Sequence, residues 1–314
     1  TRLQCRRIPA SRRSPVQGSN AKGATYLSKG RRRGIFNLNS VQRVMVLPEA
    51  LALSFVQRAY VAALLVGSLL PTIGSFVVPK RLSLLGDTSA HIAFGTAAFA
   101  SLIGIAFTDV LAVPMTALAT VLMLRLIRGF GVSGDVALTV FLTAGAALAS
   151  ASISLGSRVN LQAVLFGSIL LVGPEDLLVT ALVTAAVIGV VAFRFGDLLL
   201  FTLNEELARL KGIRTELLET LFAVVVAVSI TESMKLMGVL MVTSLLVLPA
   251  AAASSVCTSL KRSIAVSVAI AMLSTISSIS LSFAVGLPPS SLTVLMLLAM
   301  LLVMGAAGRR GLTI

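Results

Sequence analysis

Two residue types that bind metal ions stand four positions apart, Asp87 and His91, within the stretch GSFVVPKRLSLLGDTSAH that starts at Gly74. His91 is the only histidine among the 314 residues. If the surrounding apolar run is helical, residues four apart lie on one face, so the carboxylate and the imidazole are presented side by side. An oxygen and a nitrogen ligand suit a divalent ion of the zinc or manganese type. The pair therefore predicts a metal-binding position.

Asp87 can be explained in two ways. An aspartate in a lipid-soluble helix costs about 2.5–3.5 kcal/mol, so such a residue is a functional candidate by default. At a helix start, however, Asp87 can act only as an N-cap that accepts hydrogen bonds from free N–H groups, with His91 an ordinary interfacial residue. The two residues alone leave both interpretations open.

Composition places the pair in a membrane protein. Hydrophobic residues make up 57% of the chain and charged residues 12%, and the mean hydropathy is +1.00. Soluble domains are about 25% charged, so we expect an all-α polytopic membrane protein in contact with lipid. Cys5 and Cys257 are far apart and form no CxxC pair, which predicts neither a disulfide framework nor a thiolate metal site.

The net charge of +14 belongs mainly to the N-terminal segment. Eleven of the 26 basic residues lie in 1–43, where there is no acid. The remaining chain is nearly balanced, which excludes a basic nucleic-acid surface. Residues 1–44 are rich in Arg and Ser, as in a transit peptide to a plastid envelope; the favoured alternative is a poorly defined start, with Met45 just before the membrane body. We expect an unfolded extension over 1–44 and a transmembrane domain over 45–314.

About nine apolar runs approach the ~20 residues that a bilayer requires. They cover residues 57–78, 88–108, 110–127, 135–156, 175–194, 217–233, 236–257, 263–285 and 291–307. The run 160–172 is too short for a span and predicts a re-entrant or interfacial helix. With that run not crossing, the basic clusters fall on one side of the membrane, which the positive-inside rule makes cytoplasmic. The membrane body then begins outside and ends inside.

The long interior connection, 195–220, contains a predicted short amphipathic helix that Gly212 stops as a C′ residue. Its mixed charges, Glu205 and Glu206 among them, suit a solvated face; the alternative is a docking helix for a cytosolic partner. Pro249 predicts a kink in the run 236–257. Such a kink is either purely structural or frees backbone carbonyls near a pathway.

Several kinds of chemistry are missing. The chain has no Gly-Lys dipeptide for a P-loop, and it has no GxSxG or HExxH motif. An intramembrane aspartyl hydrolase needs two facing carboxylates, and Asp109 and Asp135 stand at run ends, where neither is a persuasive partner for Asp87. We therefore expect no enzyme. A secondary metal or small-solute transporter, driven without ATP, remains the alternative; it predicts midplane carboxylates and inverted repeats, and no repeat is obvious.

Four stretches carry a resemblance to the membrane-permease subunit of zinc/manganese/iron ABC importers, which covers roughly 47–307. Gly74 to Val78 with Gly86-Asp87 and Ala90-His91 resembles the first signature of that family, and Leu165 to Ser168 followed by Pro174 to Asp176 resembles its mid-chain segment. Glu206, Ala208 and Gly212 resemble its coupling segment, and Met237 to Ala251 its VGxLLVxxLLxLPAA run. The turn Val285 to Ser291 departs from the family, because it lacks the acid and the second glycine.

The resemblance implies a homodimer around a central pathway, cytosolic ATP-binding subunits and an extracytoplasmic metal-binding protein. It assigns Asp87 and His91 to the metal pathway, and Glu205, Glu206, Ala208 and Gly212 to contact with the ATPase. The ligand is a transported divalent metal, Zn, Mn or Fe, and no cofactor is bound permanently. The location implied is the plasma (inner) membrane of a prokaryote.

Overall fold

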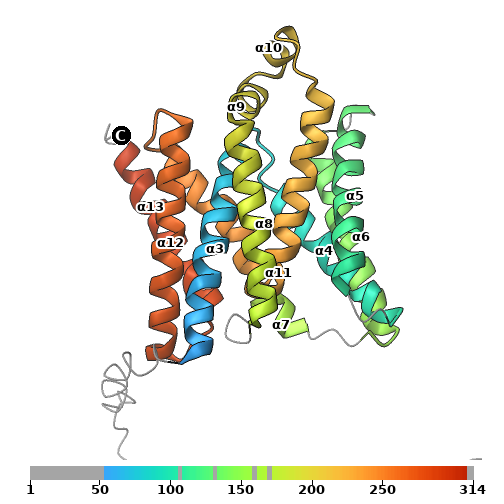
Figure 1. The fold of residues 1–314 in the computed structure, drawn as a ribbon, viewed down its shortest axis with the longest axis vertical. Coiled ribbons are helices and arrows are strands. Elements are labelled where there is room, and N and C mark those ends of the chain that lie inside the picture. The colour runs from blue at the N-terminus through green and yellow to red at the C-terminus, as the bar shows by residue number, and fades with distance from the viewer. Residues whose placement is uncertain (1–52, 105–107, 130–132, 158–160, 168–171, 310–314) are drawn as a thin grey trace, which may run out of the picture. The chain divides into compact units, whose positions relative to one another are not determined.

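A computed structural model of the chain describes residues 53–104, 108–129, 133–157, 161–167 and 172–309, and all regular elements in these ranges are α-helices (Figure 1). The helices are α3 (Ser54–Val77), α4 (Leu85–Leu102), α5 (Thr108–Gly129), α6 (Gly134–Ser154), α7 (Leu161–Phe166), α8 (Pro174–Phe193), α9 (Phe195–Leu203), α10 (Glu205–Leu210), α11 (Thr215–Ser254), α12 (Leu260–Val285) and α13 (Pro289–Arg309). The extension expected over 1–44 lies outside the described residues.

Six of these helices are long and apolar enough to cross a membrane: α3, α6, α8, α11, α12 and α13. α4 and α5 occupy the other expected runs, and α5 contains the shorter apolar stretch Leu111–Ile127. α4 begins at Leu85 and ends at Leu102, so both of its ends come earlier than those of the expected run 88–108. The all-helical, membrane-spanning architecture is therefore confirmed, with six spans meeting the length and composition criteria among the described residues.

α11 folds back on itself. As one straight helix, its 40 residues would extend for about 60 Å. However, its beginning shares one hollow with α9, where Leu217 lies near Asp197, and its end shares another, where Ser254 lies near Leu199. Because α9 has only nine residues, both ends of α11 lie close together. The break is at Gly238, whose φ of 77° and ψ of 162° are not helical. It therefore lies just inside the expected run 236–257, a few residues after the boundary expected at 233–236.

The end of α7 packs directly against this break. Gly167 and Gly238 both have positive φ, and a Cβ on either would collide with the backbone of the other segment. Two stretches that carry the family resemblance, one beginning at Leu165 and the other at Met237, therefore meet at Gly167 and Gly238. α7 has six residues and is about 9 Å long, far too short to cross. Residues 168–171 lie outside the described part, so a re-entrant course stays a prediction.

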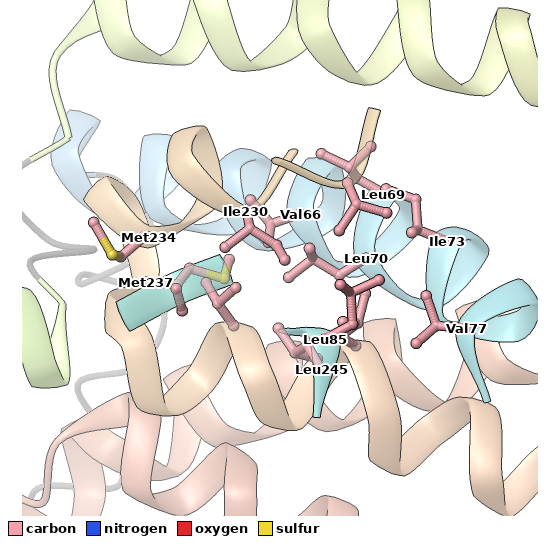
Figure 2. Packing of buried hydrophobic residues seen from close by; sticks show 14 of the residues in the cluster. Val66, Leu69, Leu70, Ile73, Val77, Leu85, Ile230, Met234, Met237 and Leu245 are labelled. Atoms are coloured by element: carbon pink, nitrogen blue, oxygen red, sulfur yellow. The ribbon is translucent and has the colours of Figure 1, made fainter. Parts of the chain in front are cut away.

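The core lies between α3 and the two halves of α11. Val66 and Leu70 of α3 lie beside Ile230 of the first half and Leu245 of the second, close to Leu85 at the start of α4 (Figure 2). All five side chains are fully buried. α8 and α13, in contrast, expose most of their apolar surface, as helices that face lipid or another subunit do.

Basic residues gather at one end of the bundle. Lys80, just after α3, lies over the ring of Phe201 in α9 at 3.0 Å, and Lys261 in α12 lies over Phe195 of the same helix at 5.4 Å. The last turn of α13 reaches this end too, since Gly308 lies against the backbone at the end of α11. We call it the basic end; it carries Lys80, Arg81, Arg194, Arg214, Lys261 and Arg309.

Candidate functional site

Asp87 and His91 face each other in the first two turns of α4. His91 Nε2 lies 3.8 Å from Asp87 Oδ1, and the side chains are 28% and 42% exposed, respectively. A tetrahedral ion bonded at about 2.0–2.1 Å to both atoms would hold them about 3.3 Å apart. A small side-chain movement therefore converts the pair into two ligands of one ion.

The interpretation of Asp87 as a helix cap is wrong. The N-cap of α4 is Leu84, and no side chain caps that helix start. Asp87 is instead the third helical residue. His91 Nδ1 is buried and has no hydrogen-bond partner among the described residues, so this imidazole is not a satisfied core histidine. A buried polar atom left without a partner has a cost, which favours a function at this position.

The packing of α4 on α6 holds the pair in place. A Cβ on Gly145 of α6 would lie 2.7 Å from the backbone carbon of His91, so the two backbones touch there. One turn earlier, Thr88 Oγ1 donates a hydrogen bond to the Leu138 carbonyl at 3.1 Å. Small residues allow such close approach in lipid, and the close approach fixes the backbone of His91.

No third strong ligand joins the pair. Among the described residues, no group of three or more His, Cys, Asp or Glu side chains is placed to hold a metal ion. The remaining ligands of an ion at Asp87 and His91 would be water, backbone or hydroxyl oxygens, or groups from another chain. A site with few protein ligands suits passage, because an ion must also leave.

The residues that the resemblance assigns to contact with the ATPase form the short helix expected from the sequence. Asn204 Oδ1 accepts a hydrogen bond from the N–H of Leu207 at 3.1 Å and caps the start of α10. At the other end, Gly212 has a φ of 77°, and its N–H donates to the Arg209 carbonyl while Ile213 N–H donates to Ala208. This Schellman arrangement confirms Gly212 as the C′ residue.

α10 divides its residues between two surfaces. Glu205 forms an exposed ion pair with Arg209 at 2.8 Å, and Glu206 is exposed, whereas Ala208 is fully buried. The sequence predicts an amphipathic helix here but not how far its leucines are exposed: Leu207 is 51% and Leu210 84% exposed. Two leucines between charges in so short a helix are the signal that could have indicated this. Exposed leucines on a helix outside the apolar spans mark an interaction surface.

Pro249 lies inside the second half of α11 and is buried. Within α11, the residue whose backbone leaves helical geometry is Gly238, not Pro249. Because proline has no N–H, the carbonyl of Leu245 lacks its intrahelical partner. This half of α11 reaches the start of α4, since the side chain of Leu246 occupies the space where Gly86 would carry a Cβ.

Known proteins match the chain over most of its length. The ABC 3 transport family matches residues 52–308. The chain is 32% identical, over 241 residues, to the high-affinity zinc uptake system membrane protein ZnuB of Buchnera aphidicola subsp. Schizaphis graminum, a match covering 75% of this chain and 91% of that protein. The manganese transport system membrane protein MntC of Halalkalibacterium halodurans is 28% identical over 208 residues, which cover 65% of this chain and 70% of that one.

A solved structure has the same fold. The structure described as PsaBC from Streptococcus pneumoniae in complex with Fab aligns with a TM-score of 0.74 and 23% identity, over 84% of this chain and 95% of that chain. The family match spans the whole membrane body, and the relatives align along most of their own length. The chain therefore belongs to the ABC 3 transport family.

Proposed function

We propose that this chain is the permease subunit of an ATP-driven importer of divalent transition-metal ions, with Asp87 and His91 on the metal pathway. The proposal is carried by the pair itself: a carboxylate and an imidazole 3.8 Å apart on an otherwise apolar helix. Similarity to membrane proteins named for zinc uptake and for manganese transport supports it. The chain is a transport subunit without an ATPase site, and the metal is Zn, Mn or Fe.

The proposed topology has nine crossings, with α11 counted as two, and the basic end in the cytoplasm of a prokaryote whose inner membrane the chain spans. Nine helical segments occupy the nine apolar runs, and the gathering of Lys and Arg at one end supports this orientation through the positive-inside rule. α7 then forms a short re-entrant helix at the external end. An external metal-binding protein would deliver the ion there.

At the cytoplasmic end, α10 is the docking element for the ATPase subunits of a homodimeric importer. Its exposed Leu207 and Leu210 support this role, because a helix with an apolar stripe docks into grooves. Movement of α10 has a direct route to the metal pair. α9 lies next to α10. The contact between Lys80 and the ring of Phe201 connects α9 to the loop that leads into α4.

The proposal is tested by uptake of radiolabelled zinc and manganese in cells that carry the permease with its ATPase and binding protein. Uptake should require an ATPase able to hydrolyse ATP. Uptake that continues without any ATPase would instead establish the secondary transporter. Unlabelled competing metals identify the preferred ion.

The docking role is tested in the same cells. Leu207→Ser combined with Leu210→Ser should abolish co-purification of the ATPase without lowering the amount of permease in the membrane, because both side chains are exposed. The matched control is Leu155→Ser, which removes a leucine that is 72% exposed at the far end of α6. Normal ATPase binding by the α10 double variant would exclude α10 as the docking element.

A further inference from the structure

We propose that Asp135 and the hydroxyl oxygen of Thr139, on the outer face of α6, form a second cation-binding position, placed between the Asp87–His91 pair and the basic end. This inference rests on the proposed function, since its ligand is the transported divalent metal. From the sequence, Asp135 is only a residue at the start of an apolar run. Its place relative to α4 changes that interpretation.

α4 and α6 run in the same direction. At their starts, Leu82 lies 3.9 Å from the position that a Cβ on Gly134 would take. Further along both helices, Gly145 lies against the backbone of His91. Contacts therefore advance together along the two helices, and α6 starts at the basic end, as α4 does.

Asp135 faces the same side of this helix pair as the metal pair. Thr88 and Leu138 touch across the contact, and each residue turns a helix by about 100°. His91 stands three positions after Thr88, Asp87 one before, and Asp135 three before Leu138. Parallel helices turn in the same sense, and at the contact each helix points toward the other. A turn in one direction on α4 and in the opposite direction on α6 therefore leads to the same side of the helix pair. Asp87, His91 and Asp135 therefore line one surface.

The hydroxyls of α6 present their oxygen atoms outward. Thr139 Oγ1 donates its hydrogen to the Asp135 carbonyl at 2.7 Å, and Thr143 Oγ1 donates to the Thr139 carbonyl at 3.0 Å. Their lone pairs remain free for a cation. Asp135, Thr139 and Thr143 line an exposed hollow of about 280 Å³ with Val136 and Val140, large enough for a hydrated ion.

The outer face of α6 differs from the faces expected to meet lipid. α8 exposes Leu178, Leu182 and Phe193, and α13 exposes Leu295 and Leu302. α6 exposes Val136 and Val140 as well, but beside them it presents a carboxylate followed by two hydroxyls at intervals of one turn. A polar stripe of this kind in a spanning helix faces a water-filled path or another protein surface, and its continuity with Asp87 and His91 identifies the path.

The two positions are successive rather than one cluster. Thr88 is level with Leu138, so Asp135 is nearer the basic end than Asp87 by two residues, about 3 Å. No third acidic or imidazole ligand joins the metal pair within the described ranges. An ion would pass from a mixed nitrogen and oxygen site to one built only of oxygen, which binds transition metals less selectively and favours release.

Uptake by the full importer is the first test. Asp135→Asn should slow zinc or manganese uptake by about tenfold, the scale seen when a group supporting a metal site is removed, whereas Asp135→Glu should retain most of it. The control is Glu216→Gln, another exposed acid in a first helical turn at the basic end, whose carbonyl also accepts a threonine hydroxyl. Wild-type uptake by Asp135→Asn, or an equal loss in Glu216→Gln, would overturn the inference.

A binding test separates this inference from the proposed function. In the purified permease–ATPase complex, with Cys5→Ser and Cys257→Ser, Thr139→Cys reacts with a water-soluble maleimide. Cadmium should slow that reaction severalfold, and Asp135→Asn should remove the protection. If cadmium has no effect on Thr139→Cys, the second position does not exist, even where the wild type transports metal. If protection is seen but no uptake depends on ATP, the site stands and the importer function falls.

Discussion

At the scale of single residues, glycines that share a positive φ differ in their surroundings. Gly167, Gly238 and Gly286 all have φ between 74° and 78°. A Cβ on Gly167 or Gly238 would enter the backbone of the other segment, whereas nothing lies within 4 Å of one on Gly286. The first two therefore combine a positive φ with a backbone contact, and the third has only the positive φ. Gly238, with a ψ of 162°, also lies outside the αL region that Gly286 occupies with a ψ of 20°.

Gly238→Ala should destabilise the protein by about 2–6 kcal/mol, because a φ of 77° with a ψ of 162° is open essentially only to glycine and costs another residue about 1–3 kcal/mol, and the collision adds a further ~1–3 kcal/mol. Gly286→Ala, the control, should cost only about 1–2 kcal/mol for its αL conformation. Thermal denaturation of the detergent-purified protein, followed by the fraction that stays monodisperse, measures both. Equal losses in the two variants would show that the contact between α7 and α11 does not matter.

The sequence predicted Asp87 and His91 because their spacing alone places them on one helix face. Two other features of the site could not be predicted in this way. The exclusion of Asp87 as a cap depends on the helix starting at Leu85, and helix starts are poorly marked where leucines precede the first turn. The surface shared with Asp135 depends on which helices touch, and small residues are frequent in nearly every span.

At the scale of elements, α4 and α6 cross in close backbone contact beside Asp87 and His91. A Cβ added to Gly95 or to Gly145 would collide with the backbone of the other helix. The sequence predicted both helices but not their contact. It also treated 195–203 as connection, because the apolar residues of α9 are too few for a span; the structure shows that they pack through Phe195 and Phe201 against α3 and its end.

Gly145→Ala should displace α4 at His91 and lower both metal uptake and thermal stability, the latter by about 1–3 kcal/mol as in overpacked cores. Gly189→Ala is the control, since no atom lies within 4 Å of its added Cβ; it should leave uptake unchanged and stabilise α8 slightly through helix propensity. Uptake and denaturation are measured on the same preparations. Normal uptake in Gly145→Ala would mean that this crossing does not position the pair.

At the scale of the whole molecule, charge distribution and chain direction agree. The fold-back of α11 at Gly238 brings α12 to begin at the basic end, beside α9. Without that reversal, the basic residues after α11 would fall at the opposite end. The sequence indicated the reversal as two separate apolar runs, 217–233 and 236–257, and Lys and Arg positions then predicted the orientation.

Cysteine labelling tests this topology directly. In a background with Cys5→Ser and Cys257→Ser, Lys211→Cys should react with a membrane-impermeant maleimide only after cells are opened, because it follows α10 at the basic end. Leu287→Cys, in the connection between α12 and α13, should react in intact cells. The reverse pattern would show that the orientation is opposite to the one proposed. Labelling of both cysteines in intact cells would contradict the proposed number of crossings.

The most direct measurement of the central claim is radiometal uptake by the complete importer carrying Asp87→Ala or His91→Ala. Both variants should lose uptake while they retain normal membrane levels and ATPase association, because Asp87 and His91, which face each other on α4, are the two proposed ligands. Uptake that survives both substitutions would contradict their place on the metal pathway.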